Sequence, residues 1–101
     1  MILSFGAGLK ALDPLLTTPL SLGTMSILIK LKAASFVYLK EQLKATQGNL
    51  SVQLNKLKEA GYIKTVKRFE GNYPLTEIKI TSTGIRAFED HVISLKDYLH
   101  L

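Results

Sequence analysis

The sequence predicts a mainly helical α+β domain, and three of its features indicate this fold class. Residues 46–62 carry apolar side chains at helical spacing between a start signal and a stop signal. After Gly61 the period of the apolar positions changes from about 3.6 to about 2, which predicts a β-hairpin. A last amphipathic helix is predicted from residue 82 onwards. The 101 residues suit one small domain, and we assign residues 1–101 to it.

The composition excludes several classes of protein. The chain has no cysteine, which rules out disulfides, zinc fingers and thiol catalysis. Residues 14–29 carry no charge, but prolines and a glycine interrupt them, and they are too short to span a bilayer as a helix. The start, MILSFGAGLK, has no basic residue before its apolar run, unlike a secretory signal. We therefore expect a cytoplasmic protein with no membrane partner.

The first half of the chain predicts two helices that precede the central one. Two pairs, at residues 13–14 and 18–19, each place a capping side chain before proline at the first helical position. The first pair opens a short turn, and the second opens a helix that runs to about residue 32. Residues 33–36 interrupt the pattern as a short extended piece, and residues 37–44 form the next helix. The earlier helix has an apolar stripe made of Leu22, Met25, Leu28 and Ile29.

The central helix is marked at both ends. Thr46 is a good N-cap, because its hydroxyl accepts a hydrogen bond from a backbone amide of the first turn. Gly61 lies where a residue in the left-handed conformation is favoured at a helix C-terminus. Leu50, Leu54 and Leu57 recur at helical spacing and predict one buried stripe. The opposite face is short and polar, and it consists of Gly48, Val52, Asn55, Lys56 and Glu59.

Two short helices joined by a brief turn, the second with a polar outer face, make a helix-turn-helix. The hairpin that follows it is a wing over residues 63–80, with strands at residues 63–69 and 75–81. We expect residues 70–74 to form a flexible loop at the tip of this wing. The helix-turn-helix and the wing together occupy residues 18–81.

The last helix, residues 82–101, is predicted to begin after a cap at Thr81 or Ser82. Its apolar side chains recur at helical spacing, and no further element follows to cover them. We therefore expect this stripe to contact a second subunit; the alternative is that it packs back on its own domain. The predicted dimer-interface residues are Phe88, Val92, Leu95 and Leu99.

The basic residues concentrate in the middle of the chain. Residues 30–68 hold nine Lys or Arg against Glu41 and Glu59, a net charge of +7, whereas residues 69–101 hold three against five acidic groups, a net charge of −2. A basic centre favours an anionic partner, nucleic acid first, although a solvated lysine-rich surface gives the same count. Amide side chains suit adenine edges, and lysines suit guanine or phosphates. The predicted DNA-binding residues are Gln47, Asn49, Ser51, Val52, Asn55, Lys56, Lys64, Lys67, Arg68 and Asn72.

Two stretches of the chain resemble the winged helix-turn-helix transcriptional regulators allied to the MarR and ArsR groups: GNLSVQLNKLKEAGYI and FEGNYPLTEIKITSTGIRAFEDHV. The similarity extends over residues 12–95 and is greatest to a short, single-domain branch. It implies a winged helix-turn-helix fold with N- and C-terminal dimerisation helices. It also implies a homodimer on double-stranded DNA, with residues 46–62 in the major groove and the wing against the backbone. Where relatives are often basic, this chain has Val52 and a wing tip without arginine.

Catalysis and metal binding find little support in the sequence. His91 and His100 lie nine residues apart on the last helix, and neither has a histidine or cysteine at ligand spacing. We expect His91 to form a surface or interface pair with Asp90 or Asp97. The sequence therefore predicts no enzyme, no catalytic residue, no metal and no cofactor.

The function predicted from these features is sequence-specific binding of double-stranded DNA by a homodimer. Such a protein would regulate transcription as a repressor, by blocking polymerase at an operator. Two alternatives remain: a winged helix used as a protein-interaction module, and a sequence-tolerant architectural DNA binder. The residues do not specify an operator or a small-molecule effector.

Overall fold

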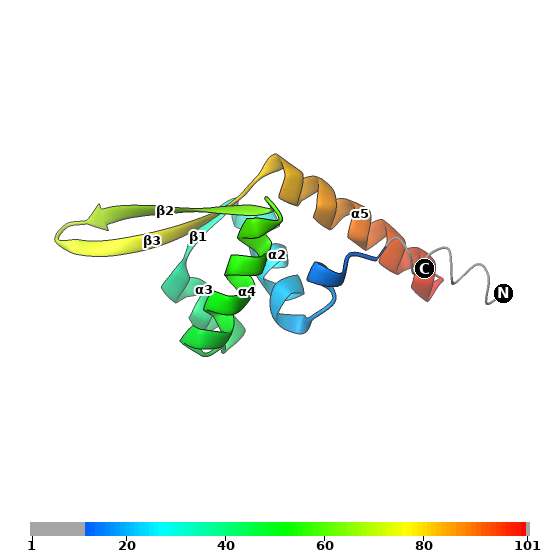
Figure 1. Ribbon diagram of the computed structural model, residues 1–101, viewed down its shortest axis with the longest axis horizontal. Helices are drawn as coiled ribbons and strands as arrows, with labels where there is room; N and C mark the ends of the chain where they lie inside the picture. The colour runs from blue at the N-terminus through cyan, green and yellow to red at the C-terminus, as the bar shows by residue number, and fades with distance from the viewer. Residues whose placement is uncertain (1–11, 101) are drawn as a thin grey trace.

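The computed structural model describes residues 12–100 and has the predicted mainly helical α+β fold (Figure 1). Its elements are, in order, the 3-10 helix η1 (Pro14–Leu16), α2 (Pro19–Leu31), β1 (Ala33–Ser35), α3 (Phe36–Leu43), α4 (Gln47–Glu59), β2 (Ile63–Glu70), β3 (Tyr73–Ile80) and α5 (Ser82–Leu99). The winged helix-turn-helix arrangement is confirmed. The N-terminal dimerisation helix that the resemblance implies has no assigned bounds before residue 18, and residues 1–11 of that stretch lie outside the described residues. No helix in the described part of the chain is long and apolar enough to cross a membrane.

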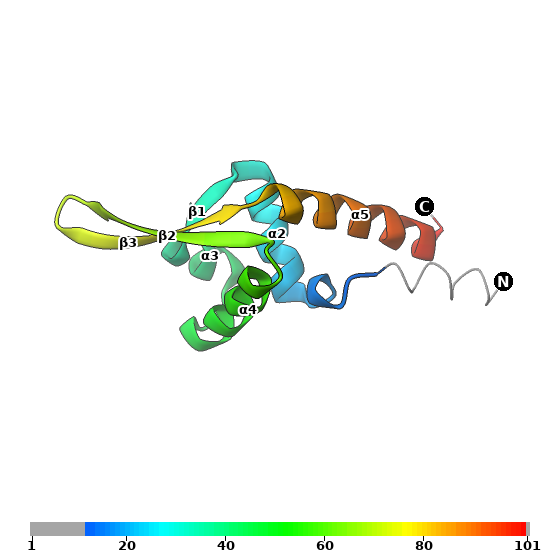
Figure 2. The ribbon, with the colours of Figure 1, turned by 45° about the horizontal axis from the view of Figure 1, so that its top comes forward.

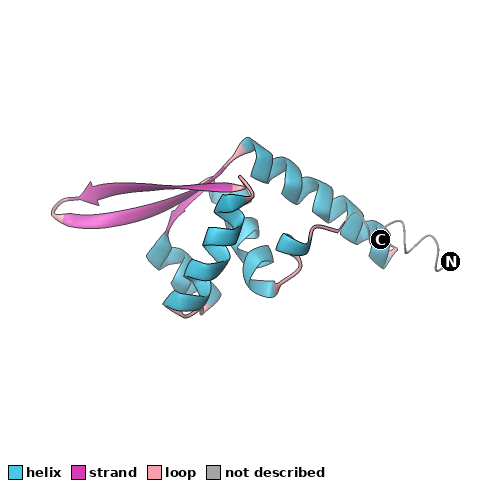
Figure 3. Ribbon diagram, viewed as in Figure 1, coloured by secondary structure: helices cyan, strands magenta, loops and turns pink. Residues whose placement is uncertain are grey.

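The molecule is elongated, with its two projecting parts at opposite ends. Figures 1 and 2 show α2, α3 and α4 gathered in the middle, the β2–β3 hairpin on one side and α5 on the other. The chain extends over 58 Å along its long axis and over 25 Å and 22 Å along the other two. Figure 3 shows that strand continues almost to the end of the hairpin. Residues 67–74 are all exposed, so the outer part of the hairpin is an arm that no other described part of the chain buries.

Each of the four α-helices within residues 12–100 begins at a hydroxyl cap that satisfies an amide of its first turn. The caps are Thr18, Ser35, Thr46 and Thr81, with N–H···Oγ distances of 3.0–3.2 Å. A cap of this kind stabilises a helix by about 1 kcal/mol. The sequence left Thr81 and Ser82 open as alternatives, and the structure selects Thr81. The Ser35 cap makes α3 start at Phe36, one residue earlier than predicted.

The core fills the space between α2, α3, α4 and the sheet. Its fully buried members are Leu16, Met25, Leu28, Leu39, Leu50, Leu57 and Ile78. The predicted stripe of α2 is partly wrong, because the helix buries Ser21 and Thr24 and leaves Leu22 and Ile29 half-buried. Both hydroxyls are satisfied within the helix, since Thr24 Oγ1 donates to the Leu20 carbonyl at 2.7 Å and Ser21 Oγ to the Thr18 carbonyl at 3.1 Å. Their burial therefore leaves no polar group unpaired.

The sheet has the order β1-β3-β2, and both pairings are antiparallel. The extended piece predicted at residues 33–36 is β1, but its pairing with the middle of β3 was not predicted. Ala34, opposite Ile78, brings the start of the helix-turn-helix onto the base of the wing. Beyond the paired residues of β1 and β3, the Ile80 amide donates a hydrogen bond to the Lys32 carbonyl at 3.1 Å, which extends this connection. At the base of the wing β3 is thus paired on both sides, by β1 and by β2, whereas at the tip β2 and β3 pair only with each other.

The predicted flexible loop at residues 70–74 is wrong. The strands pair as far as Glu70 and Tyr73, so the turn consists only of Gly71 and Asn72. Gly71 has φ +64 and Asn72 has no positive φ, which fits a type II′ turn, one of the two favoured types in two-residue hairpins. Pro74 can lie in β3 because β1 does not extend this far. The amide that proline lacks is therefore not needed for a second ladder.

Gly84, in the first turn of α5, lies against the backbone of Tyr62. A Cβ atom there would overlap the Tyr62 carbonyl oxygen, whereas a Cβ at Gly48 in α4 would meet nothing within 4 Å. We expect Gly84→Ala to lower the free energy of unfolding by about 3 kcal/mol through overpacking against backbone. Gly48→Ala, the matched control, should raise it by about 0.5 kcal/mol through helix propensity. Urea unfolding of both variants measures the difference, and similar values for the two would contradict the close contact.

Candidate nucleic-acid interface

The outward face of α4 presents the residues predicted to contact DNA. Gln47, Asn49, Asn55 and Lys56 are exposed and Ser51 is half-buried. Val52 lies in the middle of this face with 56% of its surface exposed. The helix takes this orientation because its leucine stripe is buried on the opposite side. The Gly61 amide donates to the Lys58 carbonyl at 2.9 Å and the Tyr62 amide to the Leu57 carbonyl at 3.0 Å, which is a Schellman ending with Gly61 at φ +82, as predicted.

A groove of about 440 Å³ runs between α4 and the wing. Its polar lining comes from Gln47, Ser51, Asn55 and Lys58 of α4 and from Thr65, Lys67 and Thr76 of the wing. The structure thus brings four predicted residues to one place: Gln47, Ser51, Asn55 and Lys67. Lys58 and Thr65 were not predicted. Lys58 lies one helical turn after Asn55, and Thr65 lies two residues before Lys67 on one strand face. The helix and strand periods in the sequence could therefore have identified both residues.

The two faces of the wing carry its basic residues differently. Lys67 lies on the face that lines the groove, whereas Lys64 and Arg68 alternate onto the other face. On that other face, Arg68 pairs with Glu77 at 3.3 Å, and Lys79 lies 3.8 Å from the same carboxylate. Neither Lys64 nor Lys67 has an ion pair with any residue that the structure describes. Lys67 is therefore the wing cation that is both on the groove side and without a carboxylate partner.

The predicted dimer stripe lies along α5, partly uncovered. Phe88, Val92 and Leu95 are half-buried, and Leu99 is 52% exposed. The most buried positions of α5 are Gly84, His91 and Ser94, on a neighbouring side of the helix. A hollow of about 500 Å³ adjoins the stripe, and its apolar lining consists of Ile29, Phe88, Val92 and Ile93.

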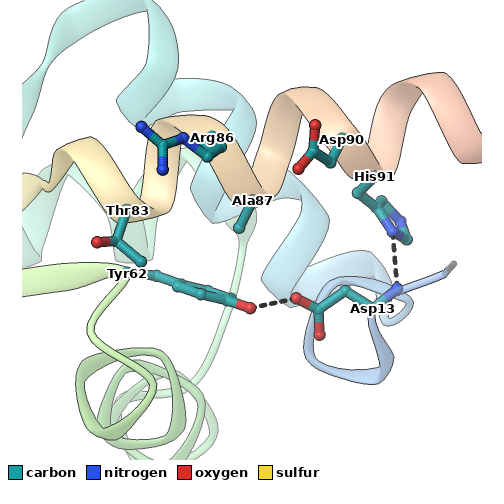
Figure 4. A pocket seen from close by; sticks show the side chains of 7 residues that line it. All are labelled: Asp13, Tyr62, Thr83, Arg86, Ala87, Asp90 and His91. Carbon is teal, nitrogen blue, oxygen red and sulfur yellow. Dashed lines mark hydrogen bonds between the residues drawn. The ribbon is translucent and has the colours of Figure 1, made fainter.

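A hydrogen-bonded network joins the end of α4 to the N-terminal segment and to α5, and we call it the Tyr62 junction (Figure 4). The Tyr62 hydroxyl donates to the Asp13 carboxylate. The Asp13 amide donates to Nδ1 of His91 at 3.2 Å, and the other oxygen of its carboxylate caps η1 by accepting from Leu15 N at 2.9 Å. The hydrogen bond to Asp13 raises the pKa of Tyr62 to about 12, with burial and the nearby negative charge adding to the shift.

The expectation that His91 forms a surface pair with Asp90 or Asp97 is wrong, because His91 is only 2% exposed and bonded to Asp13. A cavity of about 350 Å³ lies beside the junction, bordered also by Arg86 and Asp90. No group of three or more His, Cys, Asp or Glu side chains in the described chain is arranged to hold a metal ion. The sequence contained no local sign of this network, because its members come from three distant segments.

Comparisons with known proteins agree with this architecture. A family model described as a winged helix DNA-binding domain matches residues 20–99. The uncharacterized protein MJ0432 of Methanocaldococcus jannaschii is 38% identical over 71 residues, which are 70% of this chain and 77% of that protein. The structure of a transcriptional regulator homologue from Pyrococcus horikoshii OT3 is similar, with TM-score 0.85 and 28% identity over 96% of this chain and 94% of that chain. The YusO protein of Bacillus subtilis shares the fold at TM-score 0.77 and 14% identity, over 98% of this chain and 70% of that chain.

These matches confirm the resemblance to short, single-domain winged-helix regulators. The match to the family begins within α2 and ends at the last residue of α5, so it includes the helix-turn-helix, the wing and the C-terminal helix. The Tyr62 junction extends outside this match at one end only, through Asp13.

The Tyr62 junction predicts a specific dependence of stability on alkaline pH. The pKa of Tyr62 is about 12 in the folded chain against an ordinary value of 10.0, so folding favours the neutral phenol. The stability that this preference contributes is complete below pH 10 and is lost as the pH rises towards 12. The difference in free energy of unfolding between wild type and Tyr62→Phe should therefore be constant below pH 10 and shrink above it. Deprotonation of lysines affects both proteins equally and cancels.

Denaturant unfolding at a series of pH values measures this difference. Tyr73→Phe is the matched control, because the Tyr73 side chain is 80% exposed at the wing tip. The loss of stability that Tyr62 causes at alkaline pH should persist in Tyr73→Phe, because this variant keeps the bond between Tyr62 and Asp13. A Tyr62→Phe difference that stays constant up to pH 12 would show that the hydrogen bond to Asp13 is absent in solution.

Proposed function

Because this chain belongs to the winged helix DNA-binding domain family, we propose that it is a sequence-specific regulator of transcription that binds double-stranded DNA. The observation that carries the proposal is the exposed polar face of α4, which shares a groove with Lys67 of the wing. The major groove of B-DNA admits an α-helix, and amide side chains on that helix can pair with adenine edges. A wing beside the helix then adds contacts to the phosphate backbone.

The charges of the described chain support this placement. The segment that holds α3, α4 and β2 carries most of the net charge of +5, and nearly all of its basic side chains are exposed. Phosphate contacts from such groups give affinity without sequence preference. Sequence preference would come from the shorter polar side chains of α4, of which Asn55 is the best placed. Asn55 lies at the middle of the helix and borders the groove between α4 and the wing.

The proposal includes a homodimer that acts as a repressor. The stripe Phe88, Val92, Leu95 and Leu99 and the hollow beside it form an apolar surface at the end of the molecule opposite the wing. A two-fold pairing through α5 would place two copies of α4 about 34–36 Å apart, or a multiple of this distance, to match the helical repeat of DNA. A dimer on such an operator blocks polymerase. The protein would act in the cytoplasm, without a cofactor and without catalysis.

Two other functions are supported by particular observations. The exposed Val52 in the middle of the α4 face favours a protein-interaction module, because an apolar side chain there gains nothing from phosphates. The lysine-rich surface alone would suit a sequence-tolerant architectural binder. A salt titration on random duplex separates DNA binding from protein interaction, because each phosphate contact changes the slope of log K against log salt by about 0.9. Binding without salt dependence, or no binding, would favour the protein-interaction module.

Asn55 and Lys56, neighbours on the exposed face of α4, distinguish base recognition from phosphate binding. We expect Asn55→Ala to weaken binding by about 1–3 kcal/mol on a preferred site and by little on random duplex. Lys56→Ala should weaken both by a similar amount, because a phosphate carries no sequence. Both side chains are exposed, so each change should alter the free energy of unfolding by less than about 0.5 kcal/mol. Isotherms on both duplexes at one salt concentration test this, and equal losses for Asn55→Ala would exclude it as a base reader.

The dimer proposal predicts that a charge in the α5 stripe gives monomers. Val92→Asp should shift the wild-type dimer to a monomer in sedimentation at micromolar concentration, because an unpaired carboxylate cannot be buried cheaply. Val37→Asp is the matched control, since Val37 is also a valine on a helix surface, 56% exposed on α3, and should leave the dimer intact. If Val92→Asp unfolds, then Leu99→Asp at a more exposed position replaces it. A wild-type monomer at micromolar concentration would overturn the proposal.

A further inference from the structure

The tip of the wing exposes two aromatic side chains that nothing in the fold requires. Phe69 is 73% exposed and Tyr73 is 80% exposed, the two highest values among the large apolar residues that the structure describes. Neither contributes to the core cluster. They flank a two-residue turn at the end of a paired arm, so they are held on a defined backbone and not on a loose loop.

The two aromatic residues lie on opposite faces of this arm. Phe69 pairs with Pro74, and both alternate onto the face of Lys67 and Thr76, which line the groove beside α4. Tyr73 pairs with Glu70 on the other face, which further along the strands carries the Arg68–Glu77 ion pair. The groove-side face therefore ends in two neighbouring apolar rings, an aromatic one and a pyrrolidine.

The tip has no means of binding phosphate by charge. From residue 69 to residue 78 the sequence contains no lysine or arginine. The cations of the wing lie behind the tip, and Lys67 is the one on the groove-side face. A nucleic acid attracted to α4 and Lys67 would thus meet an uncharged apolar end, and Glu70 would lie on the far side of the arm.

We propose that Phe69, backed by Pro74, is an apolar wedge that enters the minor groove beside the α4 site and partly unstacks one base step. The inference rests on the proposed DNA binding and adds a contact type and a sequence preference to it. A strand of eight residues spans about 26 Å, whereas the flanking minor groove lies half a turn of DNA away, about 17 Å. The arm is therefore long enough to bring its tip there.

A phenylalanine wedge has a recognisable effect on DNA. Apolar side chains inserted between base pairs unstack a step and bend the duplex towards the major groove. Pyrimidine–purine steps such as TA and CA deform most easily, so the wedge selects sequence without reading a base edge. Preference for a flexible step at a fixed distance from the α4 site is the consequence for specificity.

The experiment uses the full chain and duplexes that the wild-type protein selects from a random library. A 2-aminopurine base is placed at the pyrimidine–purine step half a turn from the α4 site, because its fluorescence rises when it is unstacked. Wild type at saturation should raise this fluorescence, and Phe69→Ala at saturation should not. Phe69→Ala should also weaken binding roughly tenfold, the usual loss when one aromatic–base contact is removed. Phe69→Leu, which keeps an apolar wedge, should retain most of the rise.

Tyr73→Ala is the matched control, because it removes an equally exposed aromatic residue from the opposite face of the same turn. It should leave the fluorescence rise intact and the affinity within about twofold. Equal losses for Tyr73→Ala and Phe69→Ala would overturn the assignment of the wedge to the groove-side face. Salt-dependent binding by wild type without any rise would overturn the wedge and leave the proposed function standing. If no duplex is selected at all, the proposed function itself fails.

Discussion

The position of α4 depends on the backbone of Gly61 and Tyr62. The Tyr62 amide ends α4, and its carbonyl accepts from the Thr81 amide at 3.0 Å, just before α5. Thr81 Oγ1 donates to the Gly61 carbonyl at 2.6 Å, and Gly84 allows α5 to lie against the same peptide. Because both helices are fixed to one pair of residues, a rotation of α5 must also move the end of α4. In a dimer joined through α5, this contact would set the separation of the two copies of α4.

Asp13 and His91 extend the same constraint to the N-terminal segment. Tyr62 and His91 both bond to Asp13, one through its carboxylate and one through its amide. The bond to His91 requires an unprotonated Nδ1, so the neutral imidazole carries its proton on Nε2. His91 is only 2% exposed, and no fully buried side-chain polar atom in the described chain lacks a hydrogen-bond partner. The junction is therefore a hydrogen-bonded polar contact that joins three segments of the chain.

The helices and their starts could be predicted from sequence, because caps and apolar periods are local. Thr46, Gly61 and the leucine stripe define α4 within a few turns of chain. The Tyr62 junction could not be predicted, since its hydrogen bonds join residues that are 78 and 49 positions apart in the sequence. The pairing of β1 and the burial of Ser21 also depend on distant neighbours. At the wing tip, Pro74 was interpreted as part of a loop. Proline is nevertheless tolerated in a strand that has a neighbour on only one side, as β3 does there. Periodicity placed Asn55 and Lys56 together on the exposed face of α4, as the structure has them, whereas only strand register separates Lys67 from Arg68.

The strand register divides the charges of the wing between its two faces, so the net charge of +5 does not act equally on both faces. The Arg68–Glu77 pair is largely exposed on its arginine side and contributes at most about 1 kcal/mol to stability, but it gives the outer face of the arm nearly balanced charge. Lys67 lies on the groove-side face, two positions before Phe69. It is beside α4 and has no carboxylate partner among the described residues. In the proposed complex, the salt-dependent part of the affinity would come from the base of the arm and from α4. The part insensitive to salt would come from the apolar tip. Because these contributions lie at different distances along one arm, the proposed complex would combine attraction to any duplex with a requirement for one deformable step.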